Sequence, residues 1–290
     1  MTSGNGSIVL GHVNYGKSQV RLVKVVRDTP RHTIKDLDVA VALEGDFSAA
    51  YIHGDNSQML ATDTMRNTVY ALAKQHPLES IESFGLALID HFLKAGPTVQ
   101  AVTIKITEFL WQRIEVDGQP HEHSFVRGSG ERTARLWGDS SGKRTIEAGV
   151  DKVTVLKTTN SGWENFYRDE LTTLPDTNDR ILATVVTARW DYDPTQQIDY
   201  NAQWQSIYQQ ILTTFTDHYS PSVQNTLYRI GSAVLEKHPA VERIHFSFPN
   251  KHHLLFDLER FGLENNLEIF HVTQDPYGLI EGTVERRKEV

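Results

Sequence analysis

The most suggestive reactive side chain in this sequence is Lys17, within residues 11–18 (GHVNYGKS). These residues match the phosphate-loop pattern G-x-x-x-x-G-K-[ST] at every fixed position. A phosphate loop needs a helix directly after it, because free N–H groups at the helix start bind the phosphate. Residues 19–28 instead alternate in polarity, with Val20 and Leu22 on one face, which predicts a half-exposed strand. The pattern therefore favours a catalytic base beside a strand over a nucleotide-binding lysine.

Two predicted helix starts carry groups that can bind a ligand. Ser220 and Pro221 predict an N-cap and a first helical position, where free N–H groups suit an anion. Gln224 adds a carboxamide that can make two parallel hydrogen bonds to a planar, amide-like ligand. Thr62 or Asp63 is expected to cap another helix in the same way. A well-capped surface helix is the alternative interpretation of both starts.

Histidines occur in two pairs that suggest a pocket or a metal site. His252 and His253 are expected on a strand, where neighbours point to opposite faces, so at most one should enter a given pocket. His121 and His123 can lie on one side of a strand, but no third ligand follows at a recognisable spacing. A polar turn is the favoured interpretation of this pair, and no metal site is predicted.

Residues 160–180 are dense in aromatic and arginine side chains. Such a segment suits a flat ligand, on which a ring stacks while a guanidinium makes two parallel hydrogen bonds. It suits a folded loop held by an ion pair equally well. Composition leaves both interpretations open for Trp163, Phe166, Tyr167, Arg168 and Arg180.

Composition excludes several classes of protein. The chain has 290 residues, enough for one large domain or two of ordinary size, and its net charge of −8 argues against a nucleic-acid partner. No window of about twenty apolar residues predicts a membrane span, and residues 1–7 lack the regions of a signal peptide. Without cysteine there is no disulfide, thiolate nucleophile or iron–sulfur cluster, and a cytoplasmic location is expected.

The periodicity predicts an α+β protein in which the order ββααββ occurs twice, each time as an antiparallel sheet with two helices on one face. We expect a flexible tail over residues 1–10, a first unit over 11–138 and a second over 139–290. In the second unit, strands are expected at residues 145–150, 153–158, 181–190, 241–248, 253–258, 267–272 and 279–285.

Several separated segments resemble urate oxidase (uricase), and they occur in the family's order from about residue 10 to about residue 286. The resemblance implies a tandem tunnelling fold of two ββααββ units. It also implies a homotetramer whose dimers close a barrel, with active sites at the interfaces between chains. The family oxidises urate with O2 and water to 5-hydroxyisourate and hydrogen peroxide, without a metal or an organic cofactor. The segments are YGKS at 15–18, DNS and ATD within 55–63, GQPHEHSF at 118–125, VLKTTNS at 155–161, RDE with TTL within 168–174, DRIL at 179–182, PNKHH at 249–253 and DPYGLI at 275–280.

The resemblance also implies roles for individual residues. The family's proton relay falls on Lys17 and Thr62, assisted by His252. Asn250 corresponds to the residue that faces the O2 or water site above the purine, and Asp63 has a backbone role. A lysine can act as a base only when burial or a nearby cation lowers its pKa.

Urate binding is implied for a second group of residues. Arg180 and Gln224 correspond to the residues that hold the carbonyl and ring-nitrogen edge of urate, and Val223 offers a backbone N–H. Trp163 stands where the family usually has a stacking phenylalanine, and a shift that gives this role to Phe166 fits the spacing to Arg180 less well. Tryptophan can stack with a larger face.

The two alternatives are another tunnelling-fold enzyme acting on pterins or purines, and a purine-binding homologue without turnover. The first would anchor its ligand with a carboxylate. The C-terminal residues 287–290 (RKEV) lack the peroxisomal Ser-Lys-Leu signal, which favours a bacterial cytoplasmic enzyme.

Overall fold

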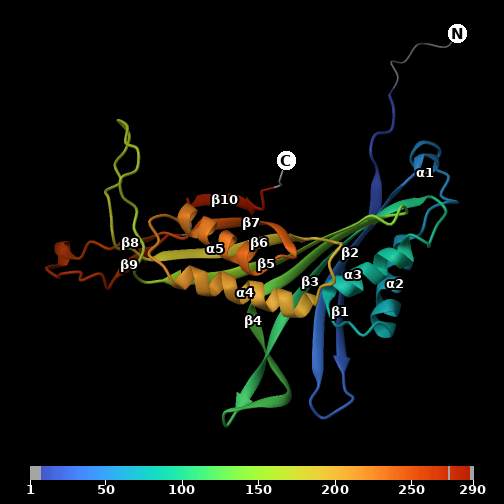
Figure 1. Ribbon diagram of the computed structural model, residues 1–290, viewed down its shortest axis with the longest axis horizontal. Helices are drawn as coiled ribbons and strands as arrows, with labels where there is room; N and C mark the ends of the chain where they lie inside the picture. Colours follow the sequence, from blue (N-terminus) through green and yellow to red (C-terminus); the bar gives the residue numbers. More distant parts are fainter. Residues whose placement is uncertain (1–7, 274, 288–290) are drawn as a thin grey trace. The chain divides into compact units, whose positions relative to one another are not determined.

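The computed structural model describes residues 8–273 and 275–287, so residues 1–7 of the predicted tail lie outside the described residues. The chain divides into two compact units (Figure 1). Unit 1 comprises the residues up to 128 together with 133–147, and unit 2 comprises 129–132 together with the residues from 148 onward. The sequence-based division into 11–138 and 139–290 stays a prediction.

Unit 1 is an antiparallel sheet with helices on one face. Its strands lie in the hydrogen-bonded order β1-β2-β3-β4, and β2 is antiparallel to both β1 and β3. Every second side chain of β2 is buried, from Leu37 to Leu43, and α2 packs against β1 while α3 packs against β3. The elements are β1 (Asn14–Val26), β2 (Thr33–Gly45), α1 (Ser48–His53), α2 (Thr62–Gln75), α3 (Ile81–Phe92), β3 (Val99–Val116) and β4 (Gln119–Asp139).

Unit 2 repeats this arrangement with strands in the order β5-β6-β7-β10. The helix α4 buries a stripe from Trp204 to Phe215, and α5 packs against β7 and β10. At Gly231 on α5 an added Cβ would lie 2.5 Å from a methyl carbon of Val284, so glycine permits the close contact with β10. The elements are β5 (Arg144–Lys157), β6 (Leu182–Tyr192), α4 (Tyr200–Thr216), α5 (Val223–Lys237), β7 (Val241–Asn250) and β10 (Gly278–Glu285).

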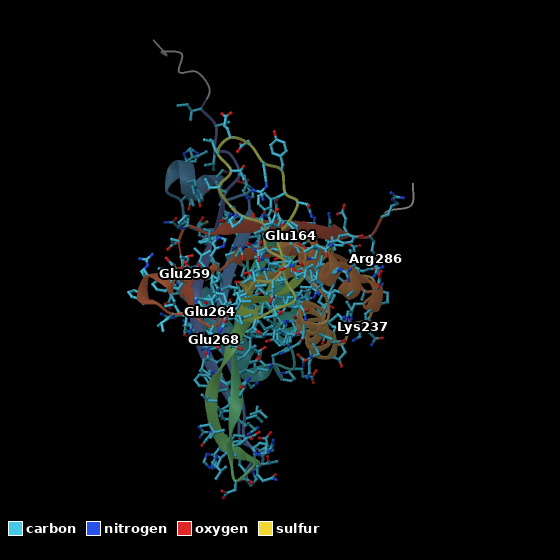
Figure 2. The ribbon with its side chains drawn as sticks, turned by 90° about the vertical axis from the view of Figure 1, so that its left-hand side faces the viewer. Glu164, Lys237, Glu259, Glu264, Glu268 and Arg286 are labelled. Carbon is cyan, nitrogen blue, oxygen red and sulfur yellow. The ribbon has the colours of Figure 1, made fainter. Side chains whose placement is uncertain are left out.

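Between β7 and β10 the chain forms a separate excursion. Strands β8 (His253–Leu255) and β9 (Phe270–Val272) pair with each other, and a single 3₁₀ turn, η1 (Glu259–Phe261), lies between them. Figure 2 shows three glutamates of this segment, Glu259, Glu264 and Glu268, and Lys237 at the end of α5. The predicted strands at 253–258 and 267–272 are therefore too long, because β8 ends at Leu255, β9 begins at Phe270, and the chain between them is irregular apart from η1.

The predicted α+β class and the antiparallel sheet are confirmed, with local corrections. The two strands expected at 145–150 and 153–158 are one strand, β5, which continues through Lys152 at a positive φ of 58°. The short helix α1 was not predicted, since its six residues offer no helical period. Within the described residues, no helix is both long and apolar enough to cross a membrane.

Candidate active site

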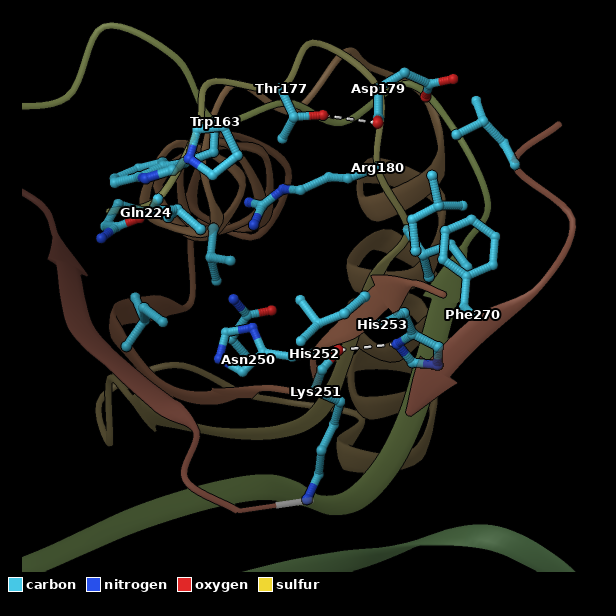
Figure 3. A pocket seen from close by; sticks show the side chains of 18 residues that line it. Trp163, Thr177, Asp179, Arg180, Gln224, Asn250, Lys251, His252, His253 and Phe270 are labelled. Carbon is cyan, nitrogen blue, oxygen red and sulfur yellow. Dashed lines mark hydrogen bonds between the residues drawn. The ribbon is translucent and has the colours of Figure 1, made fainter. Parts of the chain in front are cut away.

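Unit 2 contains a cavity of about 440 Å³ that gathers three separate segments of the chain (Figure 3). These are the irregular segment after β5, the start of α5, and the residues at the end of β7 and in the excursion. Apolar side chains of the lining include Leu174, Ile181 and Leu267. The polar side chains come from Trp163, Thr177, Asp179, Arg180, Gln224, Asn250, Lys251, His252 and His253.

Arg180 gives the cavity its electrostatic character. Its side chain extends toward the space between Trp163 and Asn250 (Figure 3). Within the described part of the chain, the guanidinium has no carboxylate partner, and its Nε is buried without a hydrogen-bond partner. Burial lowers the pKa of Arg180, which the nearby Tyr219 partly offsets. Arg180 is partly buried, and a partly desolvated cation without a counter-ion is unfavourable, so this geometry favours an anionic ligand.

The start of α5 places Val223 and Gln224 beside Arg180 in the cavity wall. The predicted cap at Ser220 and Pro221 is wrong, because the N-cap is Ser222, whose Oγ accepts a hydrogen bond from the N–H of Asn225 at 3.0 Å. Val223 and Gln224 are therefore the first helical residues, and their N–H groups have no acceptor within the helix. Both N–H groups and the positive end of the helix dipole lie at the cavity.

Hydrogen bonds among Ser220, Thr226 and His218 hold the start of α5 in place. Ser220 and Thr226 are buried, and their hydroxyl oxygens lie 2.7 Å apart. Thr226 Oγ1 lies 2.9 Å from Nε2 of His218, whose Nδ1 lies 2.7 Å from the carbonyl oxygen of Thr214. Because Nδ1 must donate to that carbonyl, neutral His218 accepts at Nε2 from Thr226. Burial lowers the pKa of His218 and favours this neutral form.

Trp163 is held through its backbone by two hydrogen bonds. Its N–H donates to the carbonyl of Thr177 at 2.6 Å, and its carbonyl accepts from the N–H of Thr177 at 3.0 Å. The preceding Gly162 leaves no room for a side chain, since a Cβ would lie 2.1 Å from the hydroxyl of Tyr219. Trp163 lines the cavity, whereas Phe166 does not and stacks against the indole at 5.5 Å between ring centroids.

Asn250, His252 and His253 follow one another at the lip of the cavity (Figure 3). Asn250 is the last residue of β7, where it is in register with Thr184 of β6. The prediction that only one of the two histidines can enter a pocket is wrong, because both line this cavity. Strand alternation fails here, since β8 begins only at His253 and His252 lies in the break before it.

Lys17 lies in unit 1, inside β1 and not in a loop. The register of β1 with β2 shifts between Lys17 and Val20, and Gln19 has a positive φ of 58°, which marks a β-bulge. An added Cβ at Gly16 would lie 1.8 Å from the carbonyl oxygen of Val41. Strand continues on both sides of Lys17, so the helix that a phosphate loop requires is absent from these described residues.

Thr62 and Asp63 begin α2, also in unit 1. The expected cap at either residue is wrong, because the N-cap is Ala61 and the helix starts at Thr62. Asp63 forms an i,i+3 ion pair with Arg66 at 2.6 Å and accepts a hydrogen bond from Asn67. None of Lys17, Thr62 and Asp63 lines the cavity of unit 2.

A sequence profile described as uricase matches residues 13–135 and 146–281, which include all of these site residues. The chain belongs to the uricase family. The uricase of Arthrobacter globiformis is 44% identical over 285 residues, covering 98% of this chain and 92% of the relative. The uricase of Dictyostelium discoideum is 40% identical over 275 residues, covering 94% and 96%. The family expected from the resemblance is confirmed.

Solved uricase structures share the fold. The crystal structure of uricase from Arthrobacter globiformis superposes with a TM-score of 0.92 at 44% identity, covering 98% of this chain and 97% of that one. Urate oxidase from Bacillus sp. TB-90 superposes with a TM-score of 0.83 at 21% identity, covering 94% and 100%, and at this identity the likeness concerns the fold alone. The tandem architecture predicted for a uricase is therefore present in this chain.

Tyr15 makes contacts that the sequence did not reveal. Its hydroxyl accepts a hydrogen bond from the N–H of Leu60 at 2.9 Å, and its ring meets Phe47 edge-on at 4.7 Å. Burial raises the pKa of Tyr15. Tyr15 precedes Lys17 by two positions on β1, and Leu60 precedes Thr62 by two positions, so this bond joins the two segments. No local sequence pattern predicts this hydrogen bond, because its two residues are far apart in the chain.

His121 and His123 pack against each other, and His123 also packs against His32. The rings of His121 and His123 meet edge to face at 4.5 Å, and His32 lies 5.8 Å from His123. Arg113 donates to the carbonyl oxygens of His121 and Glu122. Among the described residues, no group of three or more histidine or acidic side chains is arranged to hold a metal ion.

Proposed function

We propose that this chain oxidises urate with O2 and water to 5-hydroxyisourate and hydrogen peroxide. The observation that carries the proposal is the partly buried guanidinium of Arg180, which has no carboxylate partner among the described residues, in a cavity that also presents Gln224 and Asn250, in a member of the uricase family. Urate is planar and acidic and carries carbonyl and N–H groups along its edges. It therefore offers each of these side chains a complementary group.

In this proposal Arg180 and Gln224 bind one edge of the purine, and the N–H of Val223 donates to it from the first turn of α5. Trp163 stacks on the purine plane. Arg180 supplies charge-assisted hydrogen bonds, which are shorter and stronger than neutral ones. The helix start adds fixed dipoles that need no reorganisation when the anion arrives. Asp63 has only its proposed backbone role near Thr62.

The chemical step needs a base and an oxygen site. We assign proton transfer to Lys17 and Thr62 with His252, and the O2 or water site to the side of the purine that Asn250 faces. Deprotonated urate supplies two electrons to O2, which leaves as hydrogen peroxide, and water adds its hydroxyl to carbon 5. The atoms and electrons balance without a cofactor, and we propose that none is used.

The assembly is also part of the proposal. Lys17 and Thr62 belong to unit 1 and do not line the cavity of unit 2. In a homotetramer whose dimers close a barrel, another copy of the chain supplies them to each cavity. Mixing Lys17→Met with Arg180→Ala subunits would then create sites in which both defects fall together and sites that are native. Activity of the reassembled mixture well above that of either variant alone is expected, and no gain would contradict shared sites.

One assay tests the function. Protein treated with a chelator is incubated with urate and oxygen while urate absorbance and peroxide are followed. Loss of urate with equal formation of peroxide is expected. Binding without turnover would indicate a purine-binding homologue, and neither binding nor turnover would refute the proposal. The cytoplasmic location stays a prediction.

A pterin-directed enzyme is a weaker candidate because of the cavity's acidic residue. Among its described lining residues the carboxylate is that of Asp179, which accepts a hydrogen bond from the Thr159 hydroxyl at 2.8 Å. That contact and the hydrogen bond from the Thr177 hydroxyl to the backbone carbonyl of Asp179 hold this residue in the loop. A carboxylate anchor would instead have to point at the ligand beside Arg180.

A further inference from the structure

We propose that Phe166 and Arg168 are positioning residues that hold the indole of Trp163 in one orientation for the stacked purine. The inference rests on the proposed function and deepens it. Three side chains form a column in the order Arg168, Phe166 and Trp163, and the cavity lies at the end occupied by Trp163.

The geometry of the column is that of successive stacked planes. The rings of Trp163 and Phe166 are nearly parallel, at 11° between planes and 5.5 Å between centroids. On Phe166, the guanidinium carbon of Arg168 lies 4.4 Å from the ring centroid. Aromatic pairs and cation–π contacts of this kind both stabilise an orientation. One indole face is thus covered, which leaves the other for a ligand.

Arg168 also ties the column to the cavity wall. Its guanidinium pairs with Asp176 at 3.1 Å and donates to the carbonyl oxygen of Leu174 at 2.9 Å. The carboxylate of Asp176 accepts in turn from the N–H of Asn165 at 3.2 Å. Leu174 lines the cavity, so the Arg168 side chain connects the stacked rings to the other side of the same loop.

The column matters because Trp163 replaces the phenylalanine usual in the family. A phenyl ring is symmetric about its axis, whereas an indole that turns over presents a different outline to its neighbours. The backbone contacts of Trp163 fix its Cα but leave its two side-chain torsions free. Phe166 is the aromatic residue in contact with the indole, and Arg168 keeps Phe166 in place. The column therefore limits the orientations of the larger ring.

The binding test uses the fact that urate cannot turn over without O2. Anaerobic calorimetric titration with urate measures the dissociation constant of the intact protein and its variants. Phe166→Ala should raise that constant about three- to tenfold, the size of a lost aromatic pair, while kcat in air changes less than twofold. Phe166→Tyr should restore wild-type binding. The matched control is Tyr167→Ala, which removes the neighbouring ring that is 90% exposed and should leave binding unchanged.

A second measurement needs no ligand. The chain has five tryptophans, so labelling with 5-fluorotryptophan gives five fluorine resonances, of which that of Trp163 is identified by its loss in Trp163→Phe. Phe166→Ala should shift the Trp163 resonance, because the ring current of Phe166 is removed, and should broaden it as the indole samples more orientations. Arg168→Ala should produce a smaller change of the same kind, and Tyr167→Ala none.

The outcomes separate this inference from the proposed function. If wild-type protein fails to bind urate, the proposed function is wrong, and the fluorine spectrum still decides whether the column orients Trp163. If wild-type protein binds urate but Phe166→Ala binds as tightly as Tyr167→Ala, the positioning role is overturned. An unshifted Trp163 resonance in Phe166→Ala would overturn it too. Matching melting temperatures exclude loss of the fold as the cause of weaker binding.

Discussion

The two units of this chain hold their proposed site residues in different ways. In unit 2 the side chains converge on a cavity, and two of its segments are held by nearby contacts, since Ser222 caps the helix start and Thr177 bonds the backbone of Trp163. In unit 1, Lys17 lies on a strand and Thr62 at an open helix end, and neither lines that cavity. Under the proposed function, this difference would assign recognition of the purine to one unit and proton transfer to residues of the other.

The largest effect is expected at Lys17. Lys17→Met should lower kcat by at least about 100-fold, because a positioned base contributes that much, while the anaerobic dissociation constant of urate changes little. Steady-state kinetics and anaerobic calorimetry separate the two quantities. Lys105→Met, at an exposed position on β3 of the same unit, is the matched control and should behave as wild type. Retained turnover in Lys17→Met would exclude Lys17 as the catalytic base.

Arg180 should show the opposite pattern. Arg180→Ala should raise the dissociation constant of urate about 10- to 100-fold, the range for hydrogen bonds to a charged group, with a smaller effect on kcat. Arg180→Lys should recover only part of the loss, because an ammonium cannot reproduce the two parallel bonds of a guanidinium.

The control for Arg180 is Arg260→Ala, whose exposed side chain pairs with Asp257 in the excursion. Its affinity for urate should equal that of the wild type. If Arg180→Ala lowered kcat and left affinity intact, the division of labour between the units would be wrong.

A substitution at Tyr15 tests whether its hydrogen bond to Leu60 helps to position Lys17 and Thr62 in unit 1. Tyr15→Phe removes the acceptor for the N–H of Leu60 while keeping the edge contact with Phe47. A lost hydrogen bond of this kind corresponds to about fivefold, which should appear in kcat and not in urate affinity. Tyr51→Phe also removes a hydroxyl from unit 1, one that donates to the carbonyl of Asn14, and should leave kcat unchanged. Equal losses in both variants would indicate general destabilisation instead of positioning.

Sequence patterns predicted the fold better than the site contacts. Periodicity revealed the strands and long helices of both units, because buried faces impose it on residues close together in the chain. It missed α1 and divided β5 at Lys152, where a single left-handed residue lies within a continuous strand. A six-residue helix and a single residue with positive φ leave no periodic pattern in the sequence, so periodicity could not predict either.

The site was predicted mainly through the resemblance, and its supporting contacts were not. Arg180 joins Ser161 through the backbone, and Tyr15 binds Leu60 across 45 positions, which no local spacing encodes. The cap of α5 was predicted two residues too early because serine is a suitable cap at both 220 and 222. The helix α2 begins earlier than the caps expected at Thr62 or Asp63 allow, after Ala61, which makes no side-chain cap bond. The phosphate-loop pattern at Lys17 does not predict a nucleotide site by itself, because such a site needs a helix after the pattern and a strand follows it here.

The smallest expected effect is a pH dependence of stability that comes from His218, which contacts Thr226 of α5. Burial lowers the pKa of His218 in the folded chain below its ordinary value of 6.5, so the unfolded chain binds more protons in that window. Stability from neutral His218 is thus present above pH 6.5 and is lost as pH falls through the lower, folded pKa. Protonation would also make Nε2 a donor and break its acceptance from Thr226.

The melting temperature should therefore be higher at pH 7.5 than at pH 5.5, and His218→Gln should reduce that difference. His76 and His238 have pKa values lowered mainly by burial and contribute with the same sign, so the difference should not vanish. His53→Gln, at the exposed end of α1, is the control and should leave the difference unchanged. Because His218 supports Val223 and Gln224, weaker anaerobic urate binding at pH 5.5 should be less pronounced in His218→Gln. An identical pH dependence in both proteins would show that the preformed cavity does not depend on this histidine.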